Sequence, residues 1–256
     1  MNRATVEKLV YPLLGVVLVI ALWHAVCVAL DMPASVLPTP AEVGGQIVAQ
    51  RGLLWSEGLV TLAETVYGFL LALVLGIPIA IVITGSRVIN QMFYPLLVAL
   101  QSVPKVALAP ILLVWLGTGL ESKLAIAWLV AFFPIIVDTV AGLRATPKEL
   151  LELAHSLKAS RGQIFMKIQF PAALPFVITG AKVAVTLAVI GAVIGEFIGS
   201  SDGLGFLLMS AMSQINTPLA FAALFALSML GIGVYVAVVL IEKLLSPWLP
   251  VAPSSH

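Results

Sequence analysis

The residues of this 256-residue chain that could do chemistry are its three histidines, its single cysteine and one serine in a glycine-rich segment. The three histidines, His24, His155 and His256, lie far apart in the sequence. The chain has no His-Glu-x-x-His motif and no Gly-Lys dipeptide of a phosphate-binding loop. Its single cysteine, Cys27, excludes an internal disulfide and a Cys-rich metal site. We therefore expect no metal ion, no cofactor and no nucleotide site on this chain.

One catalytic pattern does match. Residues Gly199-Ser200-Ser201-Asp202-Gly203 fit the Gly-x-Ser-x-Gly pattern of serine hydrolases. That pattern needs a strand before the serine and a helix after it. Here a long apolar segment of helical length precedes it, so an intramembrane hydrolase that uses Ser201 is only an alternative. A turn at a helix end explains the same Gly and Ser residues.

The composition is that of a membrane protein. Hydrophobic residues make up 61% of the chain and charged residues 10%, whereas soluble domains carry roughly 25% charged residues. A soluble fold of this length could not keep so much apolar surface away from water. The shortage of Lys and Arg also excludes a nucleic-acid-binding face. The composition therefore predicts an all-α integral membrane protein.

Six apolar segments are long enough to cross a bilayer. They are residues 9–30, 59–84, 92–116, 123–143, 176–199 and 219–241. The third segment is interrupted by Pro95, Pro104 and Pro110, which predicts a broken span. Short helices are expected near 41–50 and from 204 to 215, and the longest polar stretch is the loop 144–175. Six spans place both termini on the same side.

The basic residues predict which side that is. Cytoplasmic segments of membrane proteins carry an excess of Lys and Arg. The segments on the side of the termini contain nine basic residues, against two, Arg51 and Lys123, on the other side. The nine are Arg3, Lys8, Arg87, Arg144, Lys148, Lys158, Arg161, Lys167 and Lys243. We therefore expect both termini and the loop 144–175 to be cytoplasmic.

The loop 144–175 carries the most specific spacing in the chain. It contains Glu152-Leu153-Ala154 and, further on, Ile168-Gln169-Phe170-Pro171. This resembles the cytoplasmic signature of ABC importer permeases: Glu-Ala-Ala, three residues, glycine, nine residues and Ile-x-Leu-Pro. Lys158 stands where the signature has its glycine, which would allow a turn with positive φ. Gly162 is the residue that we expect to take over this role.

Other segments resemble the nitrate, sulfonate and taurine branch of these permeases, over residues 59–248. They are Gln101-Ser102-Val103-Pro104, Trp115-Leu116-Gly117, Phe133-Pro134, Gly195-Glu196 and Gly203-Leu204-Gly205-Phe206. The resemblance implies the permease fold of a type I ABC importer. Its parts would be an N-terminal span with an outer loop (1–58), a permease core (59–248) and a C-terminal tail (249–256).

The resemblance also implies a function and partners. The chain would be the non-enzymatic transmembrane subunit of an ATP-driven importer in a bacterial inner membrane. Its partners would be a second copy of itself, two ATPase subunits that hold ATP and Mg²⁺, membrane lipid, and a soluble or lipid-anchored substrate-binding protein. The imported solute would be a small anion or a small heteroaromatic, vitamin-like molecule. A secondary transporter or channel is the alternative, although no internal repeat is visible.

The loop 144–175 is predicted to transmit force from the ATPases. A short amphipathic helix that rests on the bilayer surface would explain the same pattern without a partner. Under the coupling interpretation, the contact residues are Glu152, Ala154, His155, Ser156, Leu157, Lys158, Ala159, Ser160, Arg161 and Gly162.

Charged residues within spans usually face a bundle interior or a water-filled path. Gln101, Pro104 and Lys105 lie at the break in the third span, where free backbone groups are tolerated if they line a cavity. We predict that they line the translocation path. Lys105 could instead pair with Glu196 or Glu64.

Glu196 itself lies beside a seam of glycines at 191, 195 and 199, which allows close helix packing. It is predicted either to line the path or to be held by neighbouring backbone groups. Asp138, near the end of the fourth span, could hold an arginine of the loop 144–175.

Overall fold

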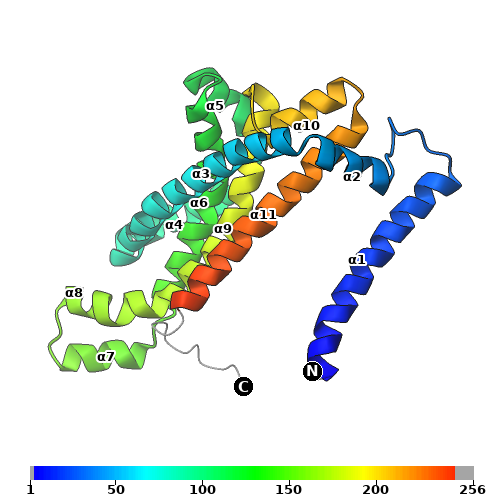
Figure 1. Ribbon diagram of the computed structural model, residues 1–256. Helices are drawn as coiled ribbons and strands as arrows, with labels where there is room; N and C mark the ends of the chain where they lie inside the picture. Colours follow the sequence, from blue (N-terminus) through cyan, green and yellow to red (C-terminus); the bar gives the residue numbers. More distant parts are fainter. Residues whose placement is uncertain (1–2, 246–256) are drawn as a thin grey trace.

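The computed structural model describes residues 3–245, with side chains described from residue 10 onward. The predicted tail 249–256 therefore lies outside the described residues. All regular structure within 3–245 is helical (Figure 1). The helices are α1 (Arg3–Ala29), α2 (Pro40–Ala49), α3 (Arg51–Gly85), α4 (Arg87–Gln101), the 3₁₀ turn η1 (Lys105–Leu108), α5 (Ala109–Leu116), α6 (Leu120–Arg144), α7 (Lys148–Ser156), α8 (Arg161–Ile164), the π-helical turn η2 (Phe165–Gln169), α9 (Phe170–Gly199), α10 (Leu204–Ser213) and α11 (Thr217–Leu245).

The predicted number of spans is confirmed, with one of them bent. Five helices of the described part are long and apolar enough to cross a membrane. Helix α4 and the η1–α5 segment form a pair that is bent by 90°. If this pair is counted as one span, the described part has up to six spans. The break falls where Pro104 cannot donate a backbone hydrogen bond and restricts the residue before it. Pro110 then lies in the first turn of α5, where a proline is tolerated.

Helix α6 lies at the centre of the bundle and packs along both α3 and α9. Small residues allow these helices to approach one another. A Cβ atom placed on Gly68 of α3 would lie 2.5 Å from Ala127 Cβ, and one on Gly191 of α9 would lie 2.6 Å from Ala127 Cα. One on Gly195 would lie 3.1 Å from Lys123 Cα. Gly191 and Gly195 of the predicted seam therefore face α6, where contact between backbones replaces contact between large side chains. Gly199, the third glycine of the seam, lies against Leu113 of α5.

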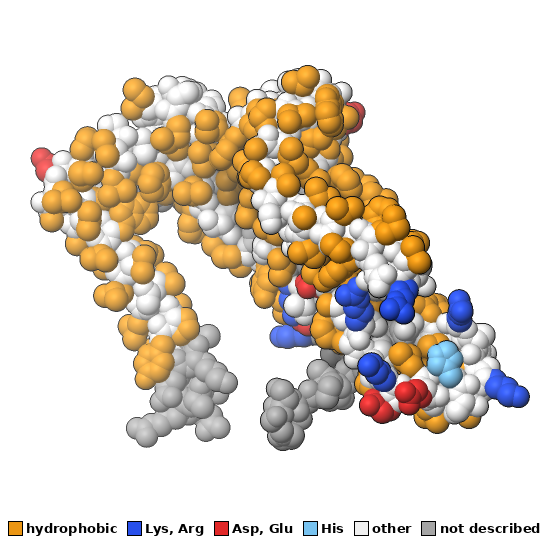
Figure 2. Space-filling view, turned by 180° about the vertical axis from the view of Figure 1, so that it is seen from behind, with side chains coloured by type: hydrophobic (Ala, Val, Ile, Leu, Met, Phe, Trp, Pro, Cys, Tyr) orange, Lys and Arg blue, Asp and Glu red, His pale blue; other side chains and the backbone are white. Residues whose placement is uncertain are grey.

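The two ends of the bundle differ in their elements. At one end, α7 and α8 form a hairpin that projects beyond the bundle (Figure 1). We call this the α7 end. At the opposite end lie α2, α10 and the junction of α5 with α6 (Figure 1). We call this the α10 end. Lys and Arg side chains gather at the α7 end, below a bundle covered by apolar side chains (Figure 2).

Helix α1 stands apart from the bundle (Figure 1). Only 6% of its most apolar 18-residue window is buried. Trp23 stacks on Phe221 of α11 with 5.9 Å between the ring centroids. Residues 31–39 connect α1 to α2, which starts with a capping box. Thr39 Oγ1 accepts a hydrogen bond from the Glu42 N–H at 3.3 Å, and Glu42 Oε2 accepts one from the Thr39 N–H at 2.7 Å.

The central packing makes a stability prediction. We expect Gly191→Ala to lower the thermal midpoint of the detergent-solubilised subunit, because the new methyl group would overlap the backbone of Ala127. Overpacking of this kind costs about 1–3 kcal/mol. Gly231→Ala in α11 is the matched control, since nothing lies within 4 Å of the added Cβ. Equal midpoints for the two variants would contradict the close approach of α9 to α6.

Candidate functional site

The hairpin at the α7 end turns through Lys158. Its backbone has a φ of 56°, in the left-handed region that glycine adopts most readily. The Lys158 N–H donates to His155 O at 2.9 Å, and the Ala159 N–H donates to Ala154 O at 3.0 Å. These two bonds form a Schellman motif, which closes the end of α7. The lysine thus takes the conformation expected of the signature glycine.

Gly162 does not replace that glycine, so this expectation is wrong. Gly162 lies inside α8 and is not among the residues with positive φ. Helix α8 begins with its own capping box, in which Ser160 Oγ accepts from the Gln163 N–H at 3.3 Å. The Ser160 N–H donates to Gln163 Oε1 at 2.8 Å. Lys158 therefore turns the chain, and Ser160 restarts the helix.

The hairpin presents most of its predicted contact residues to the outside. Ala154 is buried and Ala159 is half-buried. The exposed ones are Glu152, His155, Ser156, Leu157, Lys158, Ser160, Arg161 and Gly162. Leu150, Leu153 and Leu157 form an apolar stripe on α7, with exposed fractions of 46%, 56% and 74%. An exposed leucine stripe beside charged residues is a surface suited to a partner protein.

The break in the third span brings Gln101 and Lys105 together. Lys105 Nζ donates to the backbone oxygen of Gln101 at 3.1 Å and lies 4.9 Å from the centroid of the Phe133 ring on α6. Pro104 is exposed and immediately precedes η1. The predicted pairing of Lys105 with Glu196 or Glu64 is wrong, because both carboxylates have other partners at the α10 end.

Glu196 is buried, with 1% of its surface exposed. Its Oε1 accepts a hydrogen bond from Thr61 Oγ1 at 2.6 Å, and its Oε2 accepts one from the Gly205 N–H at 2.6 Å. Thr61 Oγ1 also accepts from the Leu204 N–H at 2.9 Å, and Glu57 Oε2 accepts from the Gly203 N–H at 2.5 Å. These contacts agree with the second predicted role of Glu196, in which neighbouring backbone groups hold its carboxylate.

The same carboxylate explains two glycines of the Gly203-Leu204-Gly205 segment. A Cβ atom on Gly203 would overlap Glu196 Oε1, and one on Gly205 would lie 2.6 Å from Glu196 Oε2. Gly203 also has a φ of 100°, which side chains disfavour. The first N–H groups of α10 are therefore capped by side chains of α3 and α9, because no side chain of the preceding turn does so.

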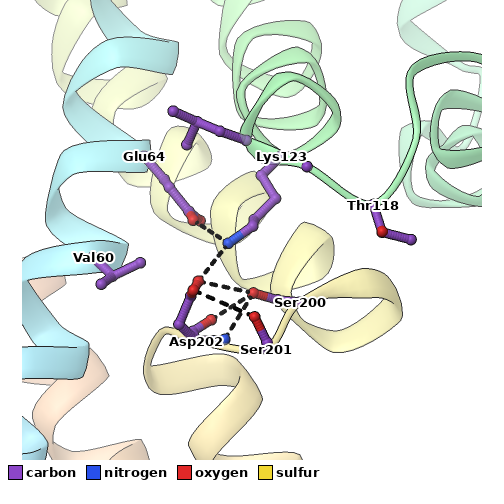
Figure 3. Close-up of a pocket in the computed structure, with 9 residues that line it drawn as sticks. Val60, Glu64, Thr118, Lys123, Ser200, Ser201 and Asp202 are labelled. Carbon is purple, nitrogen blue, oxygen red and sulfur yellow. Dashed lines mark hydrogen bonds and ion pairs between the residues drawn. The ribbon is translucent and has the colours of Figure 1, made fainter.

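Lys123 occupies a site that the sequence analysis missed. Its Nζ donates to Glu64 Oε1 at 2.6 Å and to Asp202 Oδ1 at 2.9 Å (Figure 3). The three side chains come from α3, α6 and the turn between α9 and α10, and they line a cavity of about 360 Å³. In the sequence, Lys123 stands out only as one of the two basic residues on the side opposite the termini. The unpaired charge of Glu64 inside an apolar span was the signal for a buried cation nearby.

Asp202 is the residue on which most polar contacts in this cavity converge. The hydrogen bond from Lys123 holds the pKa of Asp202 below its ordinary value. Ser200 Oγ donates to the backbone oxygen of Asp202 at 2.6 Å, and Ser201 Oγ donates to Asp202 Oδ2 at 3.4 Å. These contacts fasten the ends of α3, α6 and α9 to one another.

The hydrolase alternative is wrong. Helix α9, rather than a strand, precedes Gly199-Ser200-Ser201-Asp202-Gly203, so the geometry of the catalytic turn is absent. Ser201 Oγ is hydrogen-bonded to a carboxylate and not to a histidine. His24 is exposed on α1, which stands apart from the bundle (Figure 1). The Gly and Ser residues form the turn that leads into α10.

A comparison with protein families decides the identity. The family model described as "Binding-protein-dependent transport system inner membrane component" matches residues 72–249. The chain belongs to this family. It is thus the permease component of a bacterial, binding-protein-dependent ABC importer, located in the inner membrane, and not an enzyme. The resemblance inferred from the loop 144–175 is confirmed.

Individual relatives of this chain are also named as transport permeases. The chain is 36% identical to the riboflavin transport system permease protein RibX of Chloroflexus aurantiacus, over 95% of this chain and 93% of that protein. It is 36% identical to the formylaminopyrimidine transport permease protein ThiX of Halalkalibacterium halodurans, over 93% of this chain and 95% of that protein. The putative aliphatic sulfonates transport permease protein SsuC of Bacillus subtilis is 31% identical, over 90% and 84%.

The fold has a solved counterpart. A chain of the MetNI methionine ABC transporter in an inward-facing conformation matches with a TM-score of 0.55 and 22% identity. The match covers 74% of this chain and 98% of that one. The likeness confirms the permease fold. Membership of the family implies ATPase and substrate-binding protein partners for this permease.

The cap of α10 makes the first prediction at this site. We expect Thr61→Val to lower the thermal midpoint of the solubilised permease, since it removes the donor to Glu196 and the acceptor of the Leu204 N–H. Leaving buried groups unpaired costs about 1–3 kcal/mol. Thr84→Val is the control on the same helix, because the Thr84 hydroxyl bonds only to backbone oxygens of its own helix, those of Ala80 and Ile81. A smaller effect for Thr61→Val than for Thr84→Val would count against the cap.

The turn at Lys158 makes the second. We expect Lys158→Gly to stabilise the hairpin, because a left-handed residue with a Cβ atom costs roughly 1–2 kcal/mol. Hydrogen exchange of the amides at 152–159 should slow by about fivefold, which corresponds to about 1 kcal/mol. Lys158→Ala keeps the Cβ atom and should show no such gain. Equal exchange rates in Lys158→Gly and Lys158→Ala would show that the left-handed backbone at residue 158 does not strain the hairpin.

Proposed function

We propose that this permease works as a homodimer that imports a small heteroaromatic, vitamin-like solute, and that the α7–α8 hairpin couples it to two separate ATPase subunits. The hairpin carries the proposal. It projects from the bundle (Figure 1), is closed by the Schellman turn at Lys158, and exposes Leu150, Leu153 and Leu157 next to Glu152. Such a surface suits a groove on an ATPase subunit. ATP and Mg²⁺ would be held by the ATPase subunits and not by this chain.

The orientation follows from charge. The hairpin contributes Lys148, Lys158 and Arg161 to the basic side of the chain, and basic segments stay in the cytoplasm. In this orientation the α7 end meets the ATPases, and the α10 end, with α2 and the α5–α6 junction, faces the substrate-binding protein. ATP binding would move the hairpin and shift the permease between inward-open and outward-open states.

The broken span supports both the path and the second copy. It carries a half-buried lysine and an exposed glutamine, Lys105 and Gln101, and its second half also exposes large apolar residues such as Val114 and Trp115. A charged group is costly at a lipid-facing position and is tolerated where it lines a cavity or a protein interface. We assign this surface to the translocation path between two copies, and the remaining apolar surface to lipid.

The relatives support the class of solute. The two permeases that are 36% identical are named for riboflavin and formylaminopyrimidine, both heteroaromatic, and the sulfonate permease is 31% identical. The substrate-binding protein delivers the solute, so the ligand that it carries tests the proposed class of solute. We expect reconstituted complexes to take up a heteroaromatic probe such as riboflavin or formylaminopyrimidine faster than taurine. Faster uptake of taurine would contradict the proposed class.

Coupling is tested by reversing one charge on the hairpin. In proteoliposomes that contain the permease and its ATPase, we expect Glu152→Lys to reduce ATP hydrolysis stimulated by the binding protein by roughly tenfold or more, because like charges at an interface cost several kcal/mol. Glu121→Lys reverses an exposed charge at the α10 end and should retain most of the stimulation. Wild-type stimulation in Glu152→Lys, or a permease that purifies from mild detergent without any ATPase, would reject the coupling role.

A further inference from the structure

Arg144 is the last residue of α6 and lies four positions before the start of α7. Its guanidinium carbon lies 4.4 Å from the centroid of the Tyr94 ring, and its Nη2 donates to Asn90 Oδ1 at 2.5 Å. Tyr94 and Asn90 are one turn apart on α4, so they present a ring face and an amide oxygen to the same cation. The helix that carries the hairpin is thereby attached to the first half of the broken span.

A second contact attaches the other half of the broken span to the same helix. Lys105, the first residue of η1, lies over the ring of Phe133 on α6, and its Nζ donates to the backbone oxygen of Gln101 at the end of α4. Between these two points, Ile89, Tyr94 and Leu97 pack against buried residues of α3 and α6, including Ile136 and Val140. Within residues 10–245, both cation–π contacts join the broken span to α6. The broken span is therefore attached to α6 at two points, through α4 at the α7 end and through η1 at the bend.

The partners of Arg144 are not those that the sequence suggested. Asp138 was expected to hold an arginine of the loop 144–175, and this expectation is wrong. Asp138 lies against Gly180 of α9, whereas Arg144 contacts α4. A neutral amide and an aromatic ring hold a guanidinium in a defined orientation without neutralising its charge. The contact therefore fixes how the end of α6 lies on α4.

We propose that Arg144 is a positioning residue that transmits the movement of the α7–α8 hairpin to α4, and through α4 to the bend at residues 101–105. The proposal rests on the proposed coupling function of the hairpin. Three residues, Ala145, Thr146 and Pro147, separate Arg144 from α7, so a displacement of the hairpin reaches α6 at this residue. A defined contact at that point adds an oriented link to the apolar packing between the two helices, so that α4 moves together with the end of α6.

The test follows the hairpin and α4 separately. Single cysteines are introduced by Ser156→Cys, on the hairpin surface proposed to contact the ATPase, and by Val98→Cys on α4, in a Cys27→Ala background. Both positions are exposed in the isolated subunit, so the labelling rate at 156 reports how the hairpin meets the ATPase. The complex of permease and ATPase is reacted with a maleimide in the nucleotide-free state and after trapping with ATP and vanadate. For the wild-type contact we expect the labelling rate at both positions to differ between the two states by roughly fivefold to tenfold.

The variants then separate transmission from folding. We expect Arg144→Ala and Tyr94→Leu to keep the nucleotide-dependent change at position 156 and to lose it at position 98, with the ATPase still bound. Tyr94→Phe keeps the ring face and should behave like the wild type. Arg87→Ala removes an exposed positive charge from the start of the same helix, away from the contact, and is the matched control.

Two results would overturn the inference. An unchanged difference at position 98 in both Arg144→Ala and Tyr94→Leu would show that α4 follows the hairpin without this contact. A wild-type complex that changes at position 156 but not at 98 would show that α4 does not move with the hairpin. If the wild type changes at neither position, the coupling function itself fails, and the inference fails with it.

Discussion

The buried carboxylate of Glu196 is the interaction on which the α10 end of this permease depends. A membrane protein must satisfy every backbone N–H that it removes from water, and the first turn of a helix leaves such groups without partners. The N-terminus of α10 is buried against α3 and α9, so water does not supply them. Glu196, with Thr61 and Glu57, does so instead.

This requirement explains why the nearby sequence is rich in glycine. The carboxylate occupies the space that side chains at positions 203 and 205 would need. Beside it, Lys123 of α6 bridges Glu64 of α3 and Asp202 of the turn between α9 and α10 (Figure 3). Polar contacts therefore join these three helices near the α10 end, and close packing at Gly68 and Gly191 joins them farther along the bundle.

Helix α6 connects these features. It carries Lys123 at its first turn, packs on α3 and α9 along its length, and ends at Arg144 beside the hairpin. The broken span is attached to it through Tyr94 and Phe133. One central helix therefore leads into the hairpin, contacts the broken span and is held at the α10 end by the polar contacts of Lys123. Under the proposed function, α6 is the element that joins the surface receiving force to the path that changes shape.

Much of the fold followed from the sequence because it depends on local properties. The apolar segments, the prolines that break the third span and the spacing of the loop 144–175 are each readable within a short window. The family followed from that spacing, and so did the exposed hairpin residues. The seam at Gly191, Gly195 and Gly199 was readable for the same reason, since residues four apart share one face of a helix.

Only the tertiary structure decided which polar groups meet. Glu64 and Lys123 are 59 residues apart, Lys123 and Asp202 are 79 apart, and Arg144 and Asn90 are 54 apart. A charge in an apolar span shows that a partner exists, but the crossing points of the helices choose it, which is why Lys105 and Asp138 were given wrong partners. The left-handed Lys158 was hidden for a related reason. A lysine has no local preference for the left-handed conformation. The two hydrogen bonds that close α7, together with the start of α8 that follows, impose this conformation on Lys158.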